Sequence, residues 1–375
     1  MEGKMTDLNG DLLTIEQISG ARQVLQTSGL CFHTPVLHHV QTLCGLDSDI
    51  DLYLKLENMQ NTGSFKIRGL VNQMTHISDS AVRGQTHLIS MSCGNFGKAF
   101  AYMVQQKGLK GTVFMPDTAS ASRAELIKSY GVGVKMVPMA ELEPAVNKCL
   151  MDSNTMNLFH DNIDVMAGNG RNPPGIFCGY VYLAILEHNG QLDCYRFAIA
   201  QPTVFVCCFA PCVTTSVGLE ILEDVPDPDV VVVCCGGGGL LGGTAAAIKL
   251  SGRSNTRVYG VEPEGAPSMY ESRKAVKPVV VQGKTKVLGL APPYTGYNAF
   301  RLNVEFVDDV VLVSDDEIVA AVKRLFSRGL VVEPAGAAAF AAVMSGKIPD
   351  VKGKKVVVVI TGGNVTTQEL NKICG

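Results

Sequence analysis

The sequence of 375 residues has no tryptophan and no strong excess of either charge. Its formal net charge is −3, with acidic and basic residues interspersed, so electrostatics give no reason to expect nucleic acid or an anionic membrane as a partner. No apolar stretch reaches the roughly 20 residues that span a bilayer. The first thirty residues lack the apolar core of a signal peptide. We therefore expect a cytoplasmic protein without nucleic-acid or membrane partners.

Zinc-type cysteine spacing is also missing, although the chain has 12 cysteines. Cys207-Cys208 and Cys234-Cys235 are adjacent pairs and not C-x-x-C motifs. Without a secretory signal, free thiols are expected in place of a disulfide framework. What the chain has in abundance is glycine, with 39 residues, many of them in short clusters that indicate backbone-lined binding loops.

Apolar strand-like runs alternate with helical stretches along most of the chain, which predicts an α/β architecture with ligands at strand carboxyl ends. Several strands are continuous valine runs, as expected for strands buried on both faces of a parallel sheet. The predicted strands are 52–56, 87–91, 112–115, 134–137, 230–234, 257–261, 310–313 and 356–360. The predicted helices are 14–28, 64–75, 95–107, 119–130, 239–250, 315–328 and 335–344, with Gly131 and Gly329 as stops.

Glycine-bearing loops follow three of these strands: Ser92–Gly97, Cys235–Leu240 and Thr361–Asn364. In the second, four successive glycines lie between a buried strand and a helix. Without Cβ atoms, backbone N–H groups can converge on a phosphate at the helix N-terminus. A tight turn needs only one glycine, so the pattern favours phosphate binding. It is neither a Walker loop nor a good dinucleotide fingerprint.

Lys66 lies in the run Gly63–Gly69, after a Gly-Ser turn and between Phe65 and Ile67. A single lysine is ordinarily a solvated surface charge. Apolar neighbours and a nearby helix N-terminus disfavour the ammonium form, which is the condition an imine-forming lysine needs. The sequence therefore makes Lys66 the candidate nucleophile.

Together these motifs resemble the fold-type II pyridoxal-phosphate enzymes, specifically the serine/threonine dehydratase and serine racemase family. The matching runs occur in the family's order: Ser64–Gly69, Ser92–Asn95, Gly236–Leu240, Glu333–Ala337 and Thr361–Asn364. The resemblance covers about residues 14–170 and 215–370. It implies two open, twisted, mostly parallel α/β sheet domains with pyridoxal 5'-phosphate between them, and a homodimer.

The resemblance also implies roles for individual residues. Lys66 matches the Schiff-base lysine and Phe65 the residue beside the cofactor ring. Asn95 matches the partner of the cofactor's 3-oxygen, and Thr361 the group that faces the pyridine nitrogen. The implied phosphate cradle is Gly236, Gly237, Gly238 and Gly239, with Leu240 and Glu333 as further cofactor-binding residues. The implied substrate-carboxylate loop is Ser92, Cys93, Gly94 and Asn95.

The implied reaction is β-elimination of L-threonine or L-serine to a 2-oxo acid and ammonia, with Lys66 as the base at Cα. Cys93 stands where racemases of the family place a serine. Its thiol is therefore either a second catalytic acid, giving serine racemase with side elimination, or a small buried residue. A β-replacement synthase and an inactive cofactor-binding homologue are further alternatives.

The family's cation site corresponds here to Glu262, Ala266 and Ser268, with serine in place of a second carboxylate. With that charge missing, a monovalent ion is at least as good a fit as Mg²⁺ or Ca²⁺. The alternative for Glu262 is a surface carboxylate at a strand end.

The expected domains are a large one, residues 1–85 and 158–375, and a small one, residues 86–157. Residues 171–214 interrupt the family pattern: they carry five cysteines, few charges and no clear period. Ala167–Gly170 would join naturally to Thr214–Ser216. The segment is either a translated intron or a genuine insertion that could inactivate the enzyme.

Overall fold

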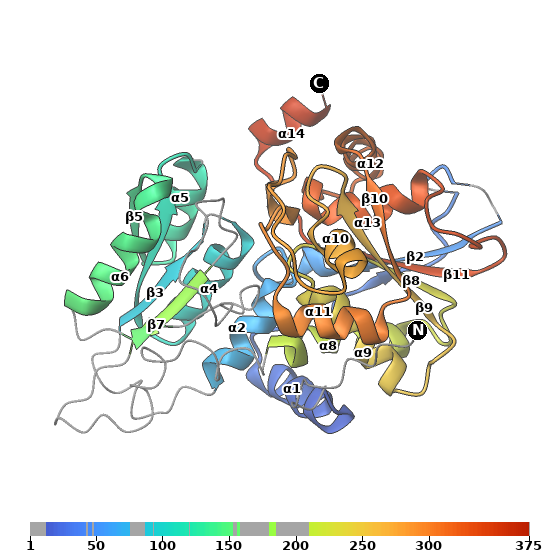
Figure 1. Ribbon diagram of the computed structural model, residues 1–375, viewed down its shortest axis with the longest axis horizontal. Helices are drawn as coiled ribbons and strands as arrows, with labels where there is room; N and C mark the ends of the chain where they lie inside the picture. Colours follow the sequence, from blue (N-terminus) through green and yellow to red (C-terminus); the bar gives the residue numbers. More distant parts are fainter. Residues whose placement is uncertain are drawn as a thin grey trace.

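A computed structural model describes residues 13–42, 44–46, 49–75, 87–92, 94–119, 121–152, 156–157, 180–184 and 210–374. These residues form two sheets, each flanked by helices, that lie side by side with α2 between them (Figure 1). Among the described helices, none is both long and apolar enough to span a membrane. Cys93 and most of the segment 171–214 lie outside the described residues.

The larger sheet has six strands in the order β1-β2-β11-β8-β9-β10. Its strands are β1 (Val36–Leu37), β2 (Asp51–Leu56), β8 (Val230–Cys234), β9 (Arg257–Pro263), β10 (Asp309–Val313) and β11 (Lys355–Ile360). All neighbours pair in parallel except β1, which pairs antiparallel with β2 at the edge. The carboxyl ends of β2, β11 and β8, three successive neighbours, therefore open on the same edge of the sheet.

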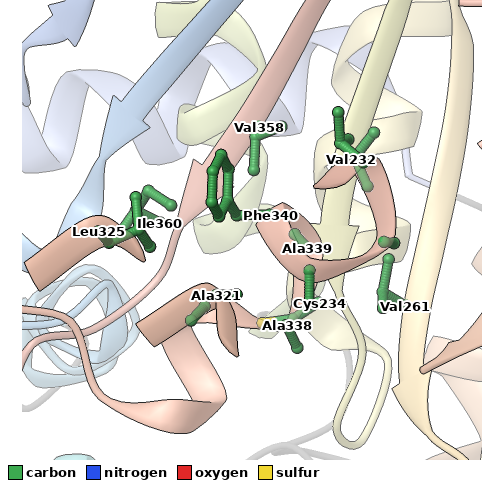
Figure 2. Packing of buried hydrophobic residues seen from close by; sticks show 14 of the residues in the cluster. Val232, Cys234, Val261, Ala321, Leu325, Ala338, Ala339, Phe340, Val358 and Ile360 are labelled. Carbon is green, nitrogen blue, oxygen red and sulfur yellow. The ribbon is translucent and has the colours of Figure 1, made fainter. Parts of the chain in front are cut away.

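Helices cover both faces of this sheet, which explains its valine-rich strands. Val230 and Val232 of β8 pack in the layer of α12 (Asp315–Phe326) and α13 (Pro334–Met344). The alternate residues Val231 and Val233 pack in the layer of α8 (Ala210–Asp224) and α9 (Gly239–Leu250). Figure 2 shows Phe340 of α13 beside Val358 of β11 in the first layer. The remaining helices of this part are α1 (Ile15–Ser28), α10 (Ser268–Ala275), α11 (Tyr297–Phe306) and α14 (Thr367–Cys374), with short 3-10 turns η1 (Glu57–Met59) and η3 (Leu288–Leu290).

The smaller sheet has five strands in the order β5-β4-β3-β6-β7. They are β3 (His87–Met91), β4 (Lys110–Pro116), β5 (Gly133–Val137), β6 (Met156–Asn157) and β7 (Tyr180–Ala184). The surrounding helices are α2 (Lys66–Thr75), α4 (Asn95–Gln106), α5 (Ala121–Ser129) and α6 (Leu142–Asp152), with η2 (Met139–Glu141). Leu88 and Val113 face the apolar side of α4, whereas Ile89 and Phe114 face α6. This sheet carries the Ser92–Gly97 loop at the end of β3.

Every predicted strand and helix is confirmed, with ends shifted by at most two residues. Thr14 caps α1 through a capping box with Gln17, and Gly131 and Gly329 adopt φ of +78° and +81°, as helix-stop glycines do. The helices α6, α8, α10, α11 and α14 and the short strands β1, β6 and β7 were not among the predicted elements.

The anomalous segment contains two described pieces. β7 pairs antiparallel with β3, with Tyr180 opposite Met91, so residues 180–184 belong to the smaller sheet although 158–375 was assigned to the larger domain. Helix α8 begins at Ala210 and runs through the predicted join at Thr214–Ser216, and the join itself stays a prediction. The domain boundaries themselves stay a prediction.

Candidate active site

The candidate site lies where β2, β11 and β8 end. β2 leads through η1 into the loop that precedes Lys66, which we call the lysine loop (Gln60–Phe65). β11 leads into Thr361–Asn364, and β8 leads into the glycine loop Cys235–Gly238. Because these strands are parallel neighbours, the three loops meet at one edge, as ligand-binding loops of open α/β sheets do.

Lys66 is the first residue of α2 and is partly buried, so it is not a solvated surface lysine. Its Nζ lies 4.8 Å from the centroid of the Phe65 ring. Backbone contacts fix the lysine loop to the loop after β11: the Phe65 N–H donates to the Thr361 carbonyl at 3.2 Å, and Ser64 bridges to Gly362. The fold therefore holds Lys66 and Thr361 as neighbours.

The Thr361 side chain is buried and contacts the last residue of β8. Its Oγ1 lies 3.2 Å from Sγ of Cys234. Burial raises the pKa of Cys234 to about 11, and the nearby positive charge of Lys66 acts in the opposite direction. The Thr361 side chain thus contacts the residue just before the glycine loop, while its carbonyl accepts from the residue just before Lys66.

The glycine loop has the geometry of an anion cradle. Gly238 adopts φ of +88°, and a Cβ on it would lie 2.4 Å from Cε of Met269, so only glycine fits. A Cβ on Gly239, the first residue of α9, would meet no atom within 4 Å, so there is open space at the helix N-terminus. Gly236 and Gly237 precede them in the loop, whereas Leu240 packs into the core beneath it.

These residues fit pyridoxal phosphate on two observations of the structure. The N-terminus of α9 offers backbone donors and open space for a phosphate. In the lysine loop, the buried hydroxyls of Ser64 and Thr62 find no hydrogen-bond partner among the described residues, which leaves them for a ligand. The site thus combines a lysine, an anion cradle and unpaired buried hydroxyls.

The predicted substrate loop lies at the N-terminus of α4. The Ser92 hydroxyl accepts hydrogen bonds from the backbone N–H groups of Gly94, at 3.3 Å, and Gly97, at 3.0 Å. Gly97 is required there, since a Cβ would lie 2.9 Å from the Ser92 carbonyl oxygen. Ser92 therefore shapes the helix start, and its role for substrate stays a prediction.

Asn95 takes part in a chain of side-chain hydrogen bonds that we call the amide chain: Lys98, Asn364, Asn95 and Glu333. Glu333 precedes α13, and its carboxylate accepts from Nδ2 of Asn95. Burial raises the pKa of Glu333 to about 7, and the hydrogen bond from Asn95 acts against this. The structure thus brings the predicted residues Asn95 and Glu333 together.

Behind the lysine loop lies a group of charges that we call the ion cluster: Lys55, Glu57, Arg68, Glu220 and Asp224. Arg68, two residues after Lys66, is 1% exposed and pairs with both Glu57 and Glu220 at 2.7–2.8 Å. Burial alone would lower the pKa of Arg68, but the two carboxylates raise it above its ordinary value. The cluster fastens α2 to α8.

The three residues of the predicted cation site have other partners. Glu262 is fully buried, so its interpretation as a surface carboxylate is wrong. Its oxygens accept from the backbone N–H groups of Met269 and Tyr270, both at 2.8 Å, and from the Ser268 hydroxyl at 3.2 Å. Burial raises the pKa of Glu262 to about 7, against these hydrogen bonds. Within the described residues, no group of three or more His, Cys, Asp or Glu side chains could hold a metal.

Sequence reasoning missed Lys98, Asn364 and the ion cluster as parts of the site. Asn364 and Arg68 lie in the motifs Thr361–Asn364 and Ser64–Gly69, so the sequence could have indicated them. Lys98 and Glu220 carried none, because only the tertiary structure brings them to these loops.

Comparison with known proteins agrees with the pyridoxal-phosphate site that the geometry indicates. A family model described as "Pyridoxal-phosphate dependent enzyme" matches residues 28–362. An L-threonine ammonia-lyase of Thermotoga maritima is 33% identical over 364 residues, covering 96% of this chain and 78% of that protein. A catabolic L-threonine dehydratase of Staphylococcus aureus is 31% identical, covering 87% of this chain and 81% of its own.

Solved structures resemble the whole chain as well. The serine racemase of Dictyostelium discoideum is similar with a TM-score of 0.70 and 27% identity, covering 94% of this chain and 99% of that one. The maize serine racemase is similar in fold, with a TM-score of 0.72 and 24% identity over 96% of this chain and 97% of its own. Because the family model and the relatives match most of the chain, and the match includes the lysine loop and the glycine loop, this chain belongs to the family of pyridoxal-phosphate-dependent enzymes.

Proposed function

We propose that the chain is an ammonia-lyase that converts L-threonine and L-serine to 2-oxobutanoate and pyruvate with release of ammonia. One observation carries the proposal: the ends of three neighbouring parallel strands bring Lys66, Thr361 and the glycine loop to a single site. The names of the relatives in Thermotoga and Staphylococcus support the same reaction.

When bound, pyridoxal phosphate supplies an electron sink for negative charge at the substrate Cα. Lys66 would hold the cofactor, and its Nζ would take the Cα proton. The backbone amides of Gly236–Gly239 would hold the phosphate at the N-terminus of α9. Phe65 would pack beside the ring, and the Thr361 hydroxyl would face the ring nitrogen.

The loop after β3 of the smaller sheet would complete the site. Ser92 and Gly94, with Cys93 between them, would bind the substrate carboxylate at the N-terminus of α4, where backbone donors and the helix dipole favour an anion. Asn95 would donate to the cofactor's 3-oxygen, with Glu333 behind it. Leu240 would support the cradle from the core.

The test is release of 2-oxo acid from L-threonine and L-serine by purified protein with pyridoxal phosphate. The Lys66→Ala variant should lose activity by about 10³-fold or more, because it removes both the covalent anchor and the base. Lys107, exposed at the end of α4, provides the matched control as Lys107→Ala, which should retain wild-type activity. If wild-type protein binds the cofactor but releases no oxo acid, the proposed activity is wrong.

A second candidate function is serine racemase, favoured by the 27% identical structure from Dictyostelium. Cys93 is the predicted acid for that reaction and lies outside the described residues. Chiral analysis of serine recovered from the same assay distinguishes the two functions, since only a racemase leaves D-serine.

The homodimer, the cytoplasmic location and the small domain of residues 86–157 join this proposal. The dimer and the domain bounds rest on the family resemblance, and the location rests on the missing signal-peptide core and the expected free thiols. Sedimentation of the purified protein tests the dimer. A cation at Glu262, Ala266 and Ser268 stays a prediction. Activity after dialysis against a chelator tests a divalent ion, and activity in buffer without Na⁺ or K⁺ tests a monovalent one.

A further inference from the structure

The amide chain connects the two sheets across the candidate site. Nζ of Lys98, on the first turn of α4, donates to Oδ1 of Asn364 at 2.7 Å. Nδ2 of Asn364 donates to Oδ1 of Asn95 at 2.7 Å and to the Thr62 carbonyl at 2.9 Å. Nδ2 of Asn95 then donates to Glu333. Four side chains, from α4, from the loop after β11 and from the N-terminus of α13, thus form one continuous path.

Each link of this path has a fixed direction, because Lys98 can only donate hydrogen bonds. Asn364 must therefore turn its oxygen to Lys98 and its NH₂ group to Asn95 and Thr62. Asn95 receives that donor on its oxygen, so its own NH₂ group must point the other way, toward Glu333. The Lys98 ammonium and the Thr62 carbonyl, which can only accept, thus act in the same sense and decide which side of the Asn95 amide is the donor at the other end.

Two glycines make room for the path. A Cβ on Gly63, in the lysine loop, would lie 2.4 Å from Oδ1 of Asn364. A Cβ on Gly362 would lie 2.3 Å from Oε1 of Glu333 and 3.1 Å from Nδ2 of Asn95. The lysine loop and the loop after β11 therefore pack directly against these amides, which ties their orientation to the position of Lys66.

The location of Lys98 is otherwise unfavourable. A cation on the first turn of a helix opposes the helix dipole. Lys98 is also partly buried, and burial lowers its pKa, with Glu333 acting in the opposite direction. A residue that serves only solubility has no reason to be placed there.

We propose that Lys98 is a positioning residue that fixes the direction of the amide chain, so that Asn95 presents N–H donors to the cofactor oxygen. The inference rests on the proposed function, since it takes the cofactor to bind in front of Asn95. Nδ2 of Asn95 carries two hydrogens. Glu333 accepts one of them, and the acceptor oxygen on the cofactor ring takes the other.

The test measures the affinity of the apoprotein for pyridoxal phosphate and the position of its visible absorption band, neither of which needs turnover. Lys98→Met keeps the length of the side chain but removes its donors. Asn364→Asp keeps an acceptor for Lys98 but cannot donate to Asn95. Both variants should bind the cofactor about tenfold more weakly, the equivalent of one lost hydrogen bond, and shift the band.

Lys98→Arg retains donors and should restore affinity and band position toward wild type. Lys107→Met, at the exposed end of the same helix, should bind as wild type. Wild-type affinity and band position in Lys98→Met would overturn the proposal. So would a lowered thermal midpoint of apo Lys98→Met with no binding defect in Asn364→Asp, because Lys98 would then act on fold stability alone. A wild-type protein that binds cofactor but releases no oxo acid affects only the proposed activity.

Discussion

The ion cluster, through Arg68, and the amide chain, through Thr62, both contact the segment around Lys66 and hold it by different means. In the ion cluster, Arg68 and Lys55 are almost fully buried and their charges are matched by carboxylates. In the amide chain, two neutral amides lie between one lysine and one carboxylate. Removing one partner of a buried ion pair strongly destabilises a protein, whereas a neutral amide can exchange hydrogen-bond partners at a smaller cost in free energy. The difference indicates that the ion cluster holds the Lys66 segment rigidly, whereas the amide chain can adjust.

The largest expected effect comes from breaking the ion cluster. Arg68→Met leaves the buried Glu57 without its ion-pair partner and leaves Glu220 with Lys55 alone, so unfolding free energy should fall by about 3–5 kcal/mol. Urea denaturation of the apoprotein measures it. The control is Arg22→Met, which removes an ion pair between α1 and the exposed Glu223 of α8 and should cost less than about 1 kcal/mol. Equal decreases in unfolding free energy in the two variants would show that Arg68 stabilises the protein no more than an exposed ion pair does.

A smaller effect should follow from placing a side-chain atom at Gly362, which packs against the amide chain. Gly362→Ala places a methyl group against Glu333 and Asn95, so it should lower unfolding free energy by about 1–3 kcal/mol and weaken cofactor binding. Gly69→Ala on α2 is the matched control, because its Cβ would meet nothing within 4 Å. That variant should gain up to about 1 kcal/mol from helix propensity. A Gly362→Ala protein as stable as wild type would refute the packing described for the chain.

The smallest effect concerns pH. Burial raises the pKa of Glu333 to about 7, above its ordinary value of 4.5, so the folded state binds the proton more tightly than the unfolded state. The contribution of Glu333 to stability should therefore be largest below pH 4.5 and decrease as pH rises toward about 7. The slope is at most about 1.4 kcal/mol per pH unit. Glu333→Gln should remove this slope, which the difference in thermal midpoints between pH 5 and pH 8 measures. If the thermal midpoints of wild type and Glu333→Gln changed equally between pH 5 and pH 8, the raised pKa of Glu333 would be contradicted.

Local sequence signals predicted much of this structure because their causes are local. Valine runs predicted strands buried on both faces, and β8 and β11 are such strands. The positive φ of Gly238 needs glycine whatever lies around it. The segment 171–214 was harder to interpret, since it has no clear period. Two of its described parts nonetheless join regular elements, β7 and the start of α8.

By itself, the sequence determined the strands, the helix stops, the glycine loop and the place of Lys66 at the start of a helix, because each depends on neighbouring residues. Only the tertiary structure decided which charges and amides surround that lysine. Arg68 meets Glu220 across 152 positions, Asn95 meets Glu333 across 238 and Lys98 meets Asn364 across 266. Such contacts follow from the packing of α2 against α8 and of α4 against the loops of the larger sheet, and no local pattern in the chain encodes them.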